Sequence, residues 1–203
     1  MPLASTLLMD IAGKNNILAF ANNVEAMMTT DLGEQFRAAM RRFPSTVSVI
    51  STAKDGWRHG MTATAVTSVS LDPPSLLVCV NRSGRLFGIM ESCHRFCVNV
   101  LHAEHVAVSR NFAEPNRPDR FAYGEWHDNE HGIPYLLDAQ VAMSCVKSLS
   151  VPHGSHTVFF GNVEEIKIRD DISTLLYQNG DYGVFQPLAR EGDASLAQLV
   201  GWG

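Results

Sequence analysis

Residues 60 to 84 read GMTATAVTSVSLDPPSLLVCVNRSG, and this stretch decides how the chain is organised. Its first half is rich in hydroxyl groups and small side chains, which keeps backbone amides accessible and supplies many neutral hydrogen-bond donors. Asp72-Pro73-Pro74 predicts a rigid turn, because proline fixes φ and disfavours the helical region for the residue before it. The apolar run from Leu76 to Val80 then predicts a buried strand.

The polar segment that ends this stretch has the composition of a phosphate site. Asn81-Arg82-Ser83-Gly84 places a guanidinium, a hydroxyl and a glycine at the end of the predicted strand. Such a segment holds a phosphate through the forked donors of arginine and through main-chain amides. A short helix predicted over Arg85 to Met90 adds a dipole that favours an anion at its start. A strand, a turn and a polar loop without any ligand fit the same residues.

The composition indicates a single folded domain with no nucleic-acid partner. The chain has 203 residues, 45% of them hydrophobic and 18% charged, so it can bury a sizeable core. Its net charge is −5 and its pI is about 5.9. The longest basic run is Arg41-Arg42, which leaves no basic stripe for a phosphate backbone.

The cysteines favour a reducing compartment and no metal. Cys79, Cys93, Cys97 and Cys145 make no CxxC pair, and two of them lie in apolar runs where a free thiol acts as a small hydrophobe. The nearest metal-like pattern, Cys93-His94-x-x-Cys97, lacks a fourth ligand for tetrahedral zinc. We therefore expect a cytoplasmic protein without a metal.

The two ends of the chain are expected to lie outside the main domain. Residues 1–30 contain neither a basic start nor an apolar run long enough to span a membrane, so no signal peptide and no membrane helix are predicted. Apolar residues recur there at helical spacing, which predicts an N-terminal helical extension. Residues 191–203 predict a C-terminal tail, and residues 31–190 are left as the main domain.

Within that domain the pattern predicts mainly strands with a few helices. Asp31-Leu32-Gly33-Glu34 has capping-box spacing and begins a helix that Pro44 ends. Lys54-Asp55-Gly56 predicts a hairpin turn. No GxGxxG follows a strand, which argues against a dinucleotide-binding α/β domain and favours a barrel. The other expected elements are strands over residues 46–53, 57–61, 96–101, 140–151 and 157–169 and a helix over residues 103–112.

A series of motifs, in order along the chain, resembles one known family. The motifs are Gly60-Met61-Thr62-Ala63, Thr67-Ser68-Val69-Ser70-Leu71-Asp72-Pro73-Pro74, Asn81-Arg82-Ser83, Phe96-x-Val98-Asn99-Val100-Leu101, Asp119-Arg120-Phe121, Gly154-Ser155-His156-Thr157-Val158-Phe159-Phe160-Gly161-Asn162-Val163 and Leu175-Leu176-Tyr177-x-x-Gly180-x-Tyr182. They resemble the flavin reductase domain family, which includes the reductase components of two-component flavin-dependent monooxygenases such as 4-hydroxyphenylacetate 3-monooxygenase. The resemblance covers Asp31 to about Phe185.

This resemblance implies a fold and an activity. The fold is a mainly β FMN-binding split β-barrel of Greek-key type, expected as a homodimer with the flavin at the subunit contact. The activity is that of an NAD(P)H:flavin oxidoreductase, which reduces FMN or FAD with NADH or NADPH and supplies the reduced flavin to a partner monooxygenase component. Hydride transfer between two stacked rings needs positioning more than acid/base groups, so no catalytic acid or base is expected.

The resemblance also implies roles for particular residues. Near the isoalloxazine it places Thr62, Ala63 and Thr64, and on the ribityl-phosphate side Ser68 and Ser70. It assigns Asn81, Arg82 and Ser83 to binding of the phosphate. It places Arg120 and Phe121 at the edge of the flavin. His156 is the implied nicotinamide contact.

Three positions depart from the family pattern. Thr64 and Ala65 stand where an asparagine and a serine are usual, and Gly154-Ser155-His156 replaces a Gly-Asp-His element. The last change removes a carboxylate that would orient the histidine. Taken without the resemblance, His156 reads as an exposed turn residue and Arg120-Phe121 as a helix-end arginine beside a core phenylalanine.

Three other functions remain open at this point. One is a flavoredoxin-like electron carrier that retains FMN and passes electrons to a protein. Another is a split-barrel oxidase acting on a small molecule such as a pyridoxine phosphate, which would want more basic residues than Arg82 and Arg85. The last is a structural domain without a cofactor. Turnover of free flavin with NADH separates the reductase from the carrier.

Overall fold

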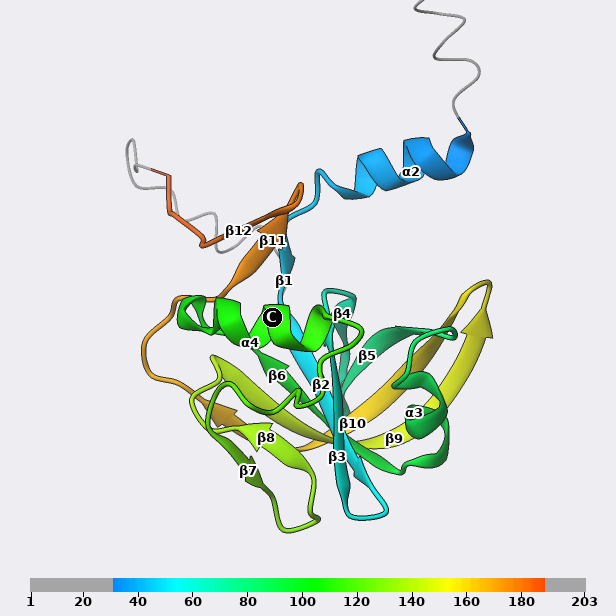
Figure 1. Cartoon of the computed structure of the whole chain (residues 1–203), viewed down its shortest axis with the longest axis vertical. Helices are drawn as coiled ribbons and strands as arrows, with labels where there is room; N and C mark the ends of the chain where they lie inside the picture. The colour runs from blue at the N-terminus through cyan, green and yellow to red at the C-terminus, as the bar shows by residue number, and fades with distance from the viewer. Residues whose placement is uncertain (1–30, 189–203) are drawn as a thin grey trace, which may run out of the picture. The chain divides into compact units, whose positions relative to one another are not determined.

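The computed structural model describes residues 31–188 (Figure 1). The chain divides into two compact units, residues 1–43 and residues 44–203. The expected N-terminal extension and C-terminal tail lie outside the described residues. The domain boundaries expected at residues 30 and 190 therefore stay predictions.

Helix α2 (Leu32–Met40) is the described helix of the first unit. Asp31 is its N-cap, and the Asp31 side chain accepts a hydrogen bond from the backbone N–H of Gly33 at 3.3 Å. Phe36 and Met40 lie one turn apart and are exposed, so the helix has an apolar stripe. The helix expected before Pro44 is confirmed.

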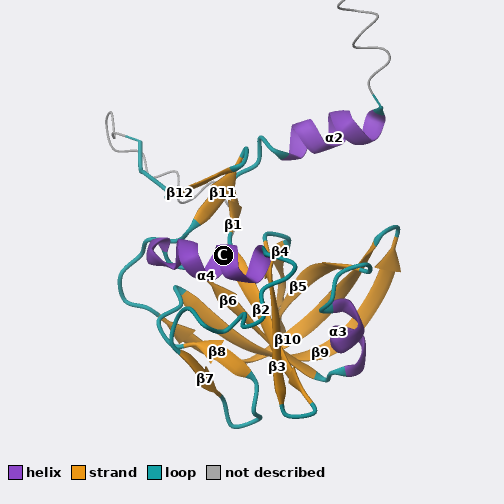
Figure 2. Ribbon diagram, viewed as in Figure 1, coloured by secondary structure: helices purple, strands orange, loops and turns teal. Residues whose placement is uncertain are grey.

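The second unit consists mainly of strands (Figure 2). Its strands are β1 (Ser45–Thr46), β2 (Ser48–Lys54), β3 (Trp57–Ala63), β4 (Val66–Leu71), β5 (Pro74–Asn81), β6 (Arg95–Val100), β7 (Trp126–Asp128), β8 (Pro134–Leu136), β9 (Val141–His153), β10 (His156–Ile168), β11 (Leu176–Gln178) and β12 (Asp181–Gly183). Its helices are α3 (Phe87–Ser92), the 3-10 turn η1 (Ala103–His105) and α4 (Val106–Ala113). The expectation of a mainly β fold with a few helices is confirmed.

A 7-stranded antiparallel sheet in the order β3-β2-β6-β9-β10-β5-β4 forms the body of this unit. The two edge strands, β3 and β4, follow one another in the sequence and are joined by a bend without pairing, so the sheet curls but stays open. Smaller sheets, β1-β11-β12 and β7-β8, flank it, and α4 packs against β3 and β2 (Figure 1).

The local turns are those that the sequence predicts. Asp55 and Gly56 adopt positive φ angles of 52° and 78° in the β2–β3 hairpin, where glycine removes the steric cost. Gly154, at φ 54°, turns β9 into β10. Strand β9 ends at His153 and strand β10 begins at His156. The segment around His156 is therefore a tight strand hairpin rather than an open loop.

Two buried clusters form the core. One lies inside the curled sheet and includes Ile50, Val78, Phe96 and Phe159. The other lies under α4 and β8 and includes Leu136. The strand expected over residues 76–80 is buried only at alternate positions, because β5 has one face on the core and one face outward.

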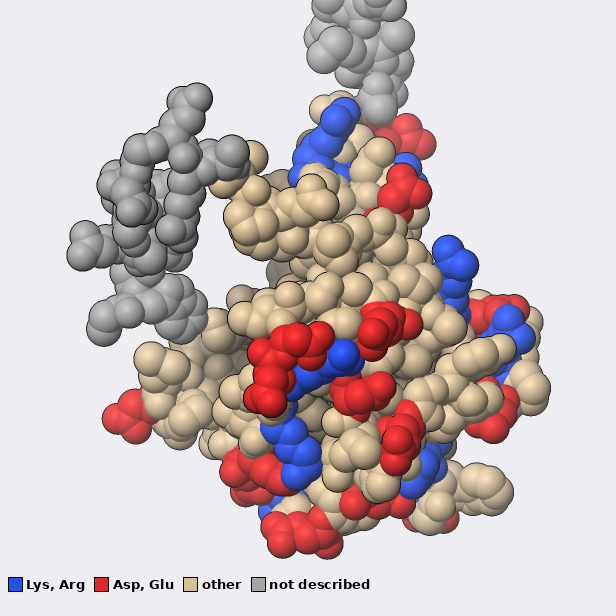
Figure 3. Space-filling model, turned by 90° about the vertical axis from the view of Figure 1, so that its left-hand side faces the viewer, with Lys and Arg blue, Asp and Glu red and all other residues tan. Residues whose placement is uncertain are grey.

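Charges of both signs are interspersed on the face drawn in Figure 3, and no continuous basic stripe crosses it. This agrees with the acidic net charge of −5. Among the described residues, no helix is long and apolar enough to cross a membrane.

Candidate functional site

A pocket of about 970 Å³ opens in the second unit. Three segments line it: residues 56–61 at the start of β3, residues 83–86 after β5, and residues 115–121 except Asn116 in the loop after α4. Volumes of about 300–1,000 Å³ are typical of pockets for cofactors and other small molecules. Ser83, Arg120 and Phe121 are the sequence-predicted site residues that line it.

Arg120 holds the loop that forms one wall of this pocket. Its guanidinium donates to the carbonyl oxygens of Phe112 at 2.7 Å and Glu114 at 2.9 Å. Longer bonds reach the carbonyls of Pro115 at 3.3 Å and Gly60 at 3.4 Å. Arg120 thereby joins α4, the loop and β3, which fits the alternative reading of Arg120 as a helix-end arginine.

Phe121 belongs to an aromatic cluster at the same wall. Its ring centroid lies 4.9 Å from that of Phe112 and 5.0 Å from that of Trp126, both edge to face. The guanidinium carbon of Arg58 lies 6.0 Å from the Phe121 ring, and Arg58 is itself held by a two-pronged contact with Asp128 at 3.0 and 2.8 Å. The Phe121 ring is therefore fixed before any ligand arrives.

In the loop after β5, the backbone amides are hydrogen-bonded within the protein, which differs from the expected phosphate site. The Asn81 side-chain oxygen accepts from both the N–H and the hydroxyl of Ser83 at 2.9 Å. The N–H of Arg82 donates to Ser155 O and that of Gly84 to Asn81 O, each at 2.9 Å. These main-chain amides are already paired, so the expected amide cradle for a phosphate is absent and the side chains must supply the donors.

The Arg82 guanidinium is the exposed donor group of this loop. Its carbon lies 6.0 Å from the ring centroid of Phe87, a cation–π contact that leaves the N–H groups available. The loop is thus a rigid turn carrying one cation.

The tertiary structure brings His156 beside this loop. His156 pairs with Asn81 across β10 and β5, and cross-strand partners share a face of the sheet. The Ser155 hydroxyl lies 2.9 Å from His156 Nδ1. Although the sequence lacks the aspartate of the Gly-Asp-His element, the serine supplies a hydrogen bond that orients the imidazole.

Two of the residues expected near the isoalloxazine face the protein. The Thr62 hydroxyl donates to Ser109 O at 2.7 Å and so fastens β3 to α4. Ala63 is 7% exposed and packs in the core. Thr64 lies exposed in the bend between β3 and β4.

Ser68 and Ser70 lie far from the loop after β5. Ser68 pairs with Leu76, which at about 3.3 Å per residue places it roughly 17 Å from Asn81 along the strand. Ser70 pairs with Ser75, and its hydroxyl accepts from the N–H of Asp72 at 3.0 Å. Within one copy of the chain, these serines and the Asn81–Ser83 loop do not meet at one phosphate.

Comparison with known proteins identifies the family. A family model described as flavin reductase like domain matches residues 40–186. The chain belongs to this family. The reductase component of the FADH(2)-dependent resorcinol hydroxylase of Rhizobium sp. is 42% identical over 77% of this chain and 89% of its own length. An FMN reductase (NADH), RutF, of Acinetobacter baylyi is 40% identical over 78% and 84%.

Solved structures of the same family support the fold. Flavin reductase PheA2 in its native state has 32% identity and a TM-score of 0.71, covering 78% of this chain and 100% of that one. BorF, the flavin reductase component of a bacterial two-component tryptophan halogenase, has 28% identity and a TM-score of 0.70, covering 77% and 99%. The split-barrel expectation is confirmed, with a sheet that curls but has two free edges.

Sequence reasoning missed several pocket residues of this flavin reductase family member. Arg58, His59 and Arg117 line the pocket, yet they lie in two separate segments. Their only common sequence signal is a basic residue near a turn, which is too frequent to single out. Their convergence is a property of the folded chain.

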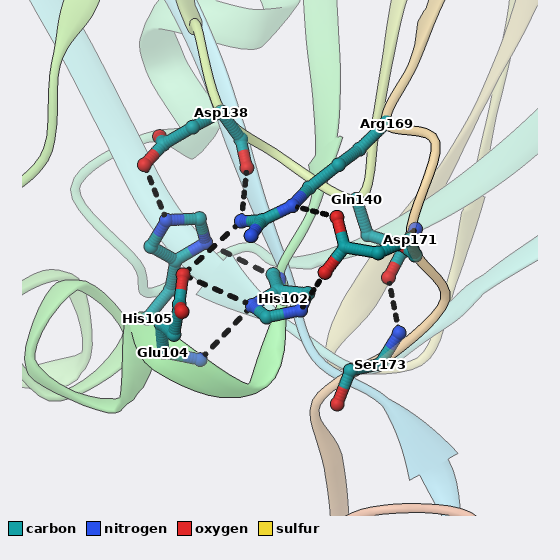
Figure 4. A network of polar contacts seen from close by, with 8 residues as sticks. All are labelled: His102, Glu104, His105, Asp138, Gln140, Arg169, Asp171 and Ser173. Carbon is teal, nitrogen blue, oxygen red and sulfur yellow. Dashed lines mark hydrogen bonds and ion pairs between the residues drawn. The ribbon is translucent and has the colours of Figure 1, made fainter.

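A second polar cluster lies apart from the pocket and serves the fold (Figure 4). His102 Nε2 lies 3.2 Å from Asp171 Oδ2 and His105 Nε2 lies 3.1 Å from Asp138 Oδ2, though neither contact has hydrogen-bond alignment. Arg169 donates to Asp171, and that hydrogen bond lowers the pKa of the Asp171 carboxyl. The cluster ties the chain after β10 to the turn before α4.

Thiol reactivity gives a direct test of the core. Cys97 and Cys145 are each 1% exposed, and burial raises the pKa of Cys145 to about 12 and that of Cys97 as well. At pH 8 we expect the half-buried Cys79 to react with a thiol reagent, while Cys97 and Cys145 react only after unfolding. A reagent titration with and without denaturant measures this, with Cys79→Ser as the control. Rapid reaction of all four thiols in the folded protein would contradict the packing.

Proposed function

We propose that this chain is an NAD(P)H:flavin oxidoreductase that reduces FMN or FAD and supplies reduced flavin to a separate monooxygenase component. The observation that carries the proposal is the arginine-lined pocket, which adjoins the Asn81–Ser83 loop through Ser83, in a chain of the flavin reductase family. A bound flavin supplies the electron sink and takes hydride directly from the nicotinamide. The residues of the chain therefore have the task of binding and orienting the flavin and the nicotinamide.

The available side chains fit an anionic flavin. Arg82 offers a guanidinium whose N–H groups have no acceptor among the described residues, and Arg85 contacts only the amide oxygen of Asn116 at 3.3 Å. Guanidinium groups without a carboxylate partner match phosphate oxygens in charge and geometry. Hydride transfer itself needs no acid or base, so these groups have only to bind and position the flavin and the nicotinamide.

The names of the relatives support a two-component system. The Rhizobium protein is the reductase component of a hydroxylase, and BorF is that of a halogenase. A reductase of this kind passes its product to another protein, so we infer a monooxygenase as the functional partner.

The test is catalytic turnover with free flavin. Purified protein should oxidise NADH or NADPH through many cycles when FMN or FAD is added in excess, followed by the absorbance of the reduced nicotinamide. An electron carrier would hold one flavin per chain and show no turnover of the free flavin. Failure to bind or reduce any flavin would overturn the proposed function.

His156 is expected to act on the nicotinamide alone. His156→Ala should raise the KM for NADH and lower kcat/KM about tenfold while flavin affinity stays unchanged, because binding energy for one substrate is removed. Steady-state kinetics and a flavin titration measure the two effects. Ser155→Ala should reproduce part of the defect, since the Ser155 hydroxyl lies 2.9 Å from the His156 ring. A variant that loses flavin affinity but uses NADH normally would place His156 in the flavin site.

We further propose that the protein is a homodimer with the flavin at the subunit contact. Phe160 pairs with Leu149 on one side and with Leu77 on the other, so the three side chains share the outward face of the sheet. Leu149 is 55% exposed and Val151 42% exposed on this face. The same face continues to His156 and Asn81, so a second copy seated there would lie against the site.

Sedimentation is expected to give a dimer at micromolar concentration. Leu149→Glu should shift the protein to monomer, because a charge on an apolar interface leaves an unpaired buried ion. Ile172→Glu is the control, since Ile172 is 88% exposed and lies outside this face. A wild-type monomer, or equal behaviour of the two variants, would contradict the interface.

We propose a cytoplasmic location, because all four cysteines are free and a reducing compartment keeps them so.

A further inference from the structure

Two of the four arginines that line the pocket have no carboxylate partner. Arg58 is paired with Asp128, and Arg117 is paired with Glu114 at 2.6 Å. Arg85 bonds only to the side-chain amide of Asn116, and Arg120 only to carbonyl oxygens, among the residues that the structure describes. Two positive charges therefore face one cavity without an internal counter-ion.

These two charges lie close enough to disfavour each other. Partial burial, followed by the charge of Arg85, lowers the pKa of Arg120 from its ordinary arginine value. The loop contacts hold Arg120 in place at this cost. An anion between the two guanidinium groups would remove the repulsion, which makes this part of the pocket a site for negative charge.

The pocket continues from the loop that carries the flavin phosphate in the proposed function. Ser83 belongs to both, and Arg85 follows it by two positions on the pocket side. A ligand whose first phosphate lies at Arg82 would meet Arg85 and Arg120 with a second phosphate. FMN has no second phosphate, whereas FAD continues beyond the FMN phosphate into an adenosine monophosphate.

The far side of the pocket has groups suited to a nucleoside. Trp57 lines it at the tip of the β2–β3 hairpin and is 74% exposed, which leaves its indole free to stack on a base. Asp119 also lines it, and one carboxylate oxygen already accepts from the N–H of Phe121 at 3.0 Å. The other oxygen is an acceptor for ribose hydroxyls. The volume of about 970 Å³ is ample for an adenosine monophosphate.

We propose that this pocket binds the adenosine monophosphate half of FAD, with Arg85 and Arg120 on its phosphate, so that FAD binds more tightly than FMN. This inference rests on the proposed function, since it takes the flavin phosphate to lie at the Asn81–Ser83 loop. Arg85 is the residue that discriminates, because Arg120 also supports the loop.

The test is a comparison of binding, measured by quenching of flavin fluorescence and by calorimetry. The wild-type chain should bind FAD at least about tenfold more tightly than FMN, and AMP should compete with FAD but not with FMN. Arg85→Ala should weaken FAD about 10- to 100-fold and leave FMN within about twofold, as expected for loss of a charged hydrogen bond. Arg85→Lys should restore part of the affinity. Trp57→Ala should weaken FAD about tenfold without affecting FMN.

Arg37→Ala is the control, because Arg37 lies exposed on α2 and does not line the pocket. Equal losses of FAD and FMN in Arg85→Ala would overturn the inference and assign Arg85 to the flavin phosphate. A rise confined to the KM for NADH or NADPH would also overturn it and assign the pocket to the nicotinamide dinucleotide. A chain that reduces FMN and FAD with equal affinity keeps the proposed function and loses this inference. Tight binding of FAD without turnover would overturn the proposed function and keep this inference.

Discussion

Asn99→Leu is expected to lower the free energy of unfolding by about 3 kcal/mol, because it leaves buried backbone groups without partners. Asn99 is fully buried in β6. Its side-chain amide donates to Val49 O at 3.0 Å, and its side-chain oxygen accepts from the N–H of Leu136 at 2.8 Å. The leucine fills a similar volume and replaces neither bond. Urea unfolding of the two proteins measures the difference.

Asn99→Leu should also affect the pocket. Leu136 in β8 pairs with Trp126 in β7, and the Trp126 ring packs 5.0 Å from that of Phe121 at the pocket wall. Loosening β8 should therefore weaken flavin binding as well as stability. Asn162→Leu is the matched control, because Asn162 is half-buried and its side chain makes no hydrogen bond among the described residues. An equal loss of stability in both variants would mean that the Asn99 bonds contribute nothing specific.

Arg82→Ala is expected to weaken FMN binding by about 1.5–3 kcal/mol, the range for a hydrogen bond to a charged group. The structure adds a reason, since the N–H groups of Ser83 and Gly84 are already paired with Asn81 and that of Arg82 with Ser155. The side chains must then carry the phosphate. Riboflavin has no phosphate and should bind the variant as it binds the wild type.

Titration of the three flavins against one set of variants separates the two arginines of this region. Arg82→Ala should weaken both FMN and FAD, whereas the change at Arg85 should weaken FAD alone. The exposed Arg37 again provides the control. Equal weakening of FMN and riboflavin binding by Arg82→Ala would show that the flavin phosphate does not bind at this loop.

Residue types and their local order determined most of the secondary structure. The Asp55-Gly56 turn, the Asp72-Pro73-Pro74 turn and the long strands β9 and β10 were all predictable, because each depends on the φ preferences of neighbouring residues or on alternation along one strand. The order of the motifs also identified the family and hence the curled sheet. Each turn and each strand belongs to a single segment, so one segment of sequence is enough to indicate it.

The composition of the site was decided only by the tertiary structure. Arg58, Arg85 and Arg120 come from three segments, and which of them keeps unpaired charge depends on whether folding places a carboxylate beside it. Likewise, Asn81 and His156 meet through strand register, while Ser68 is carried to the other end of β5. Hydrogen-bond partners and electrostatic neighbours are contacts between distant parts of the chain. The sequence by itself therefore determined the strands, the turns and the family, and the packing of those strands determined which side chains remain free to hold a ligand.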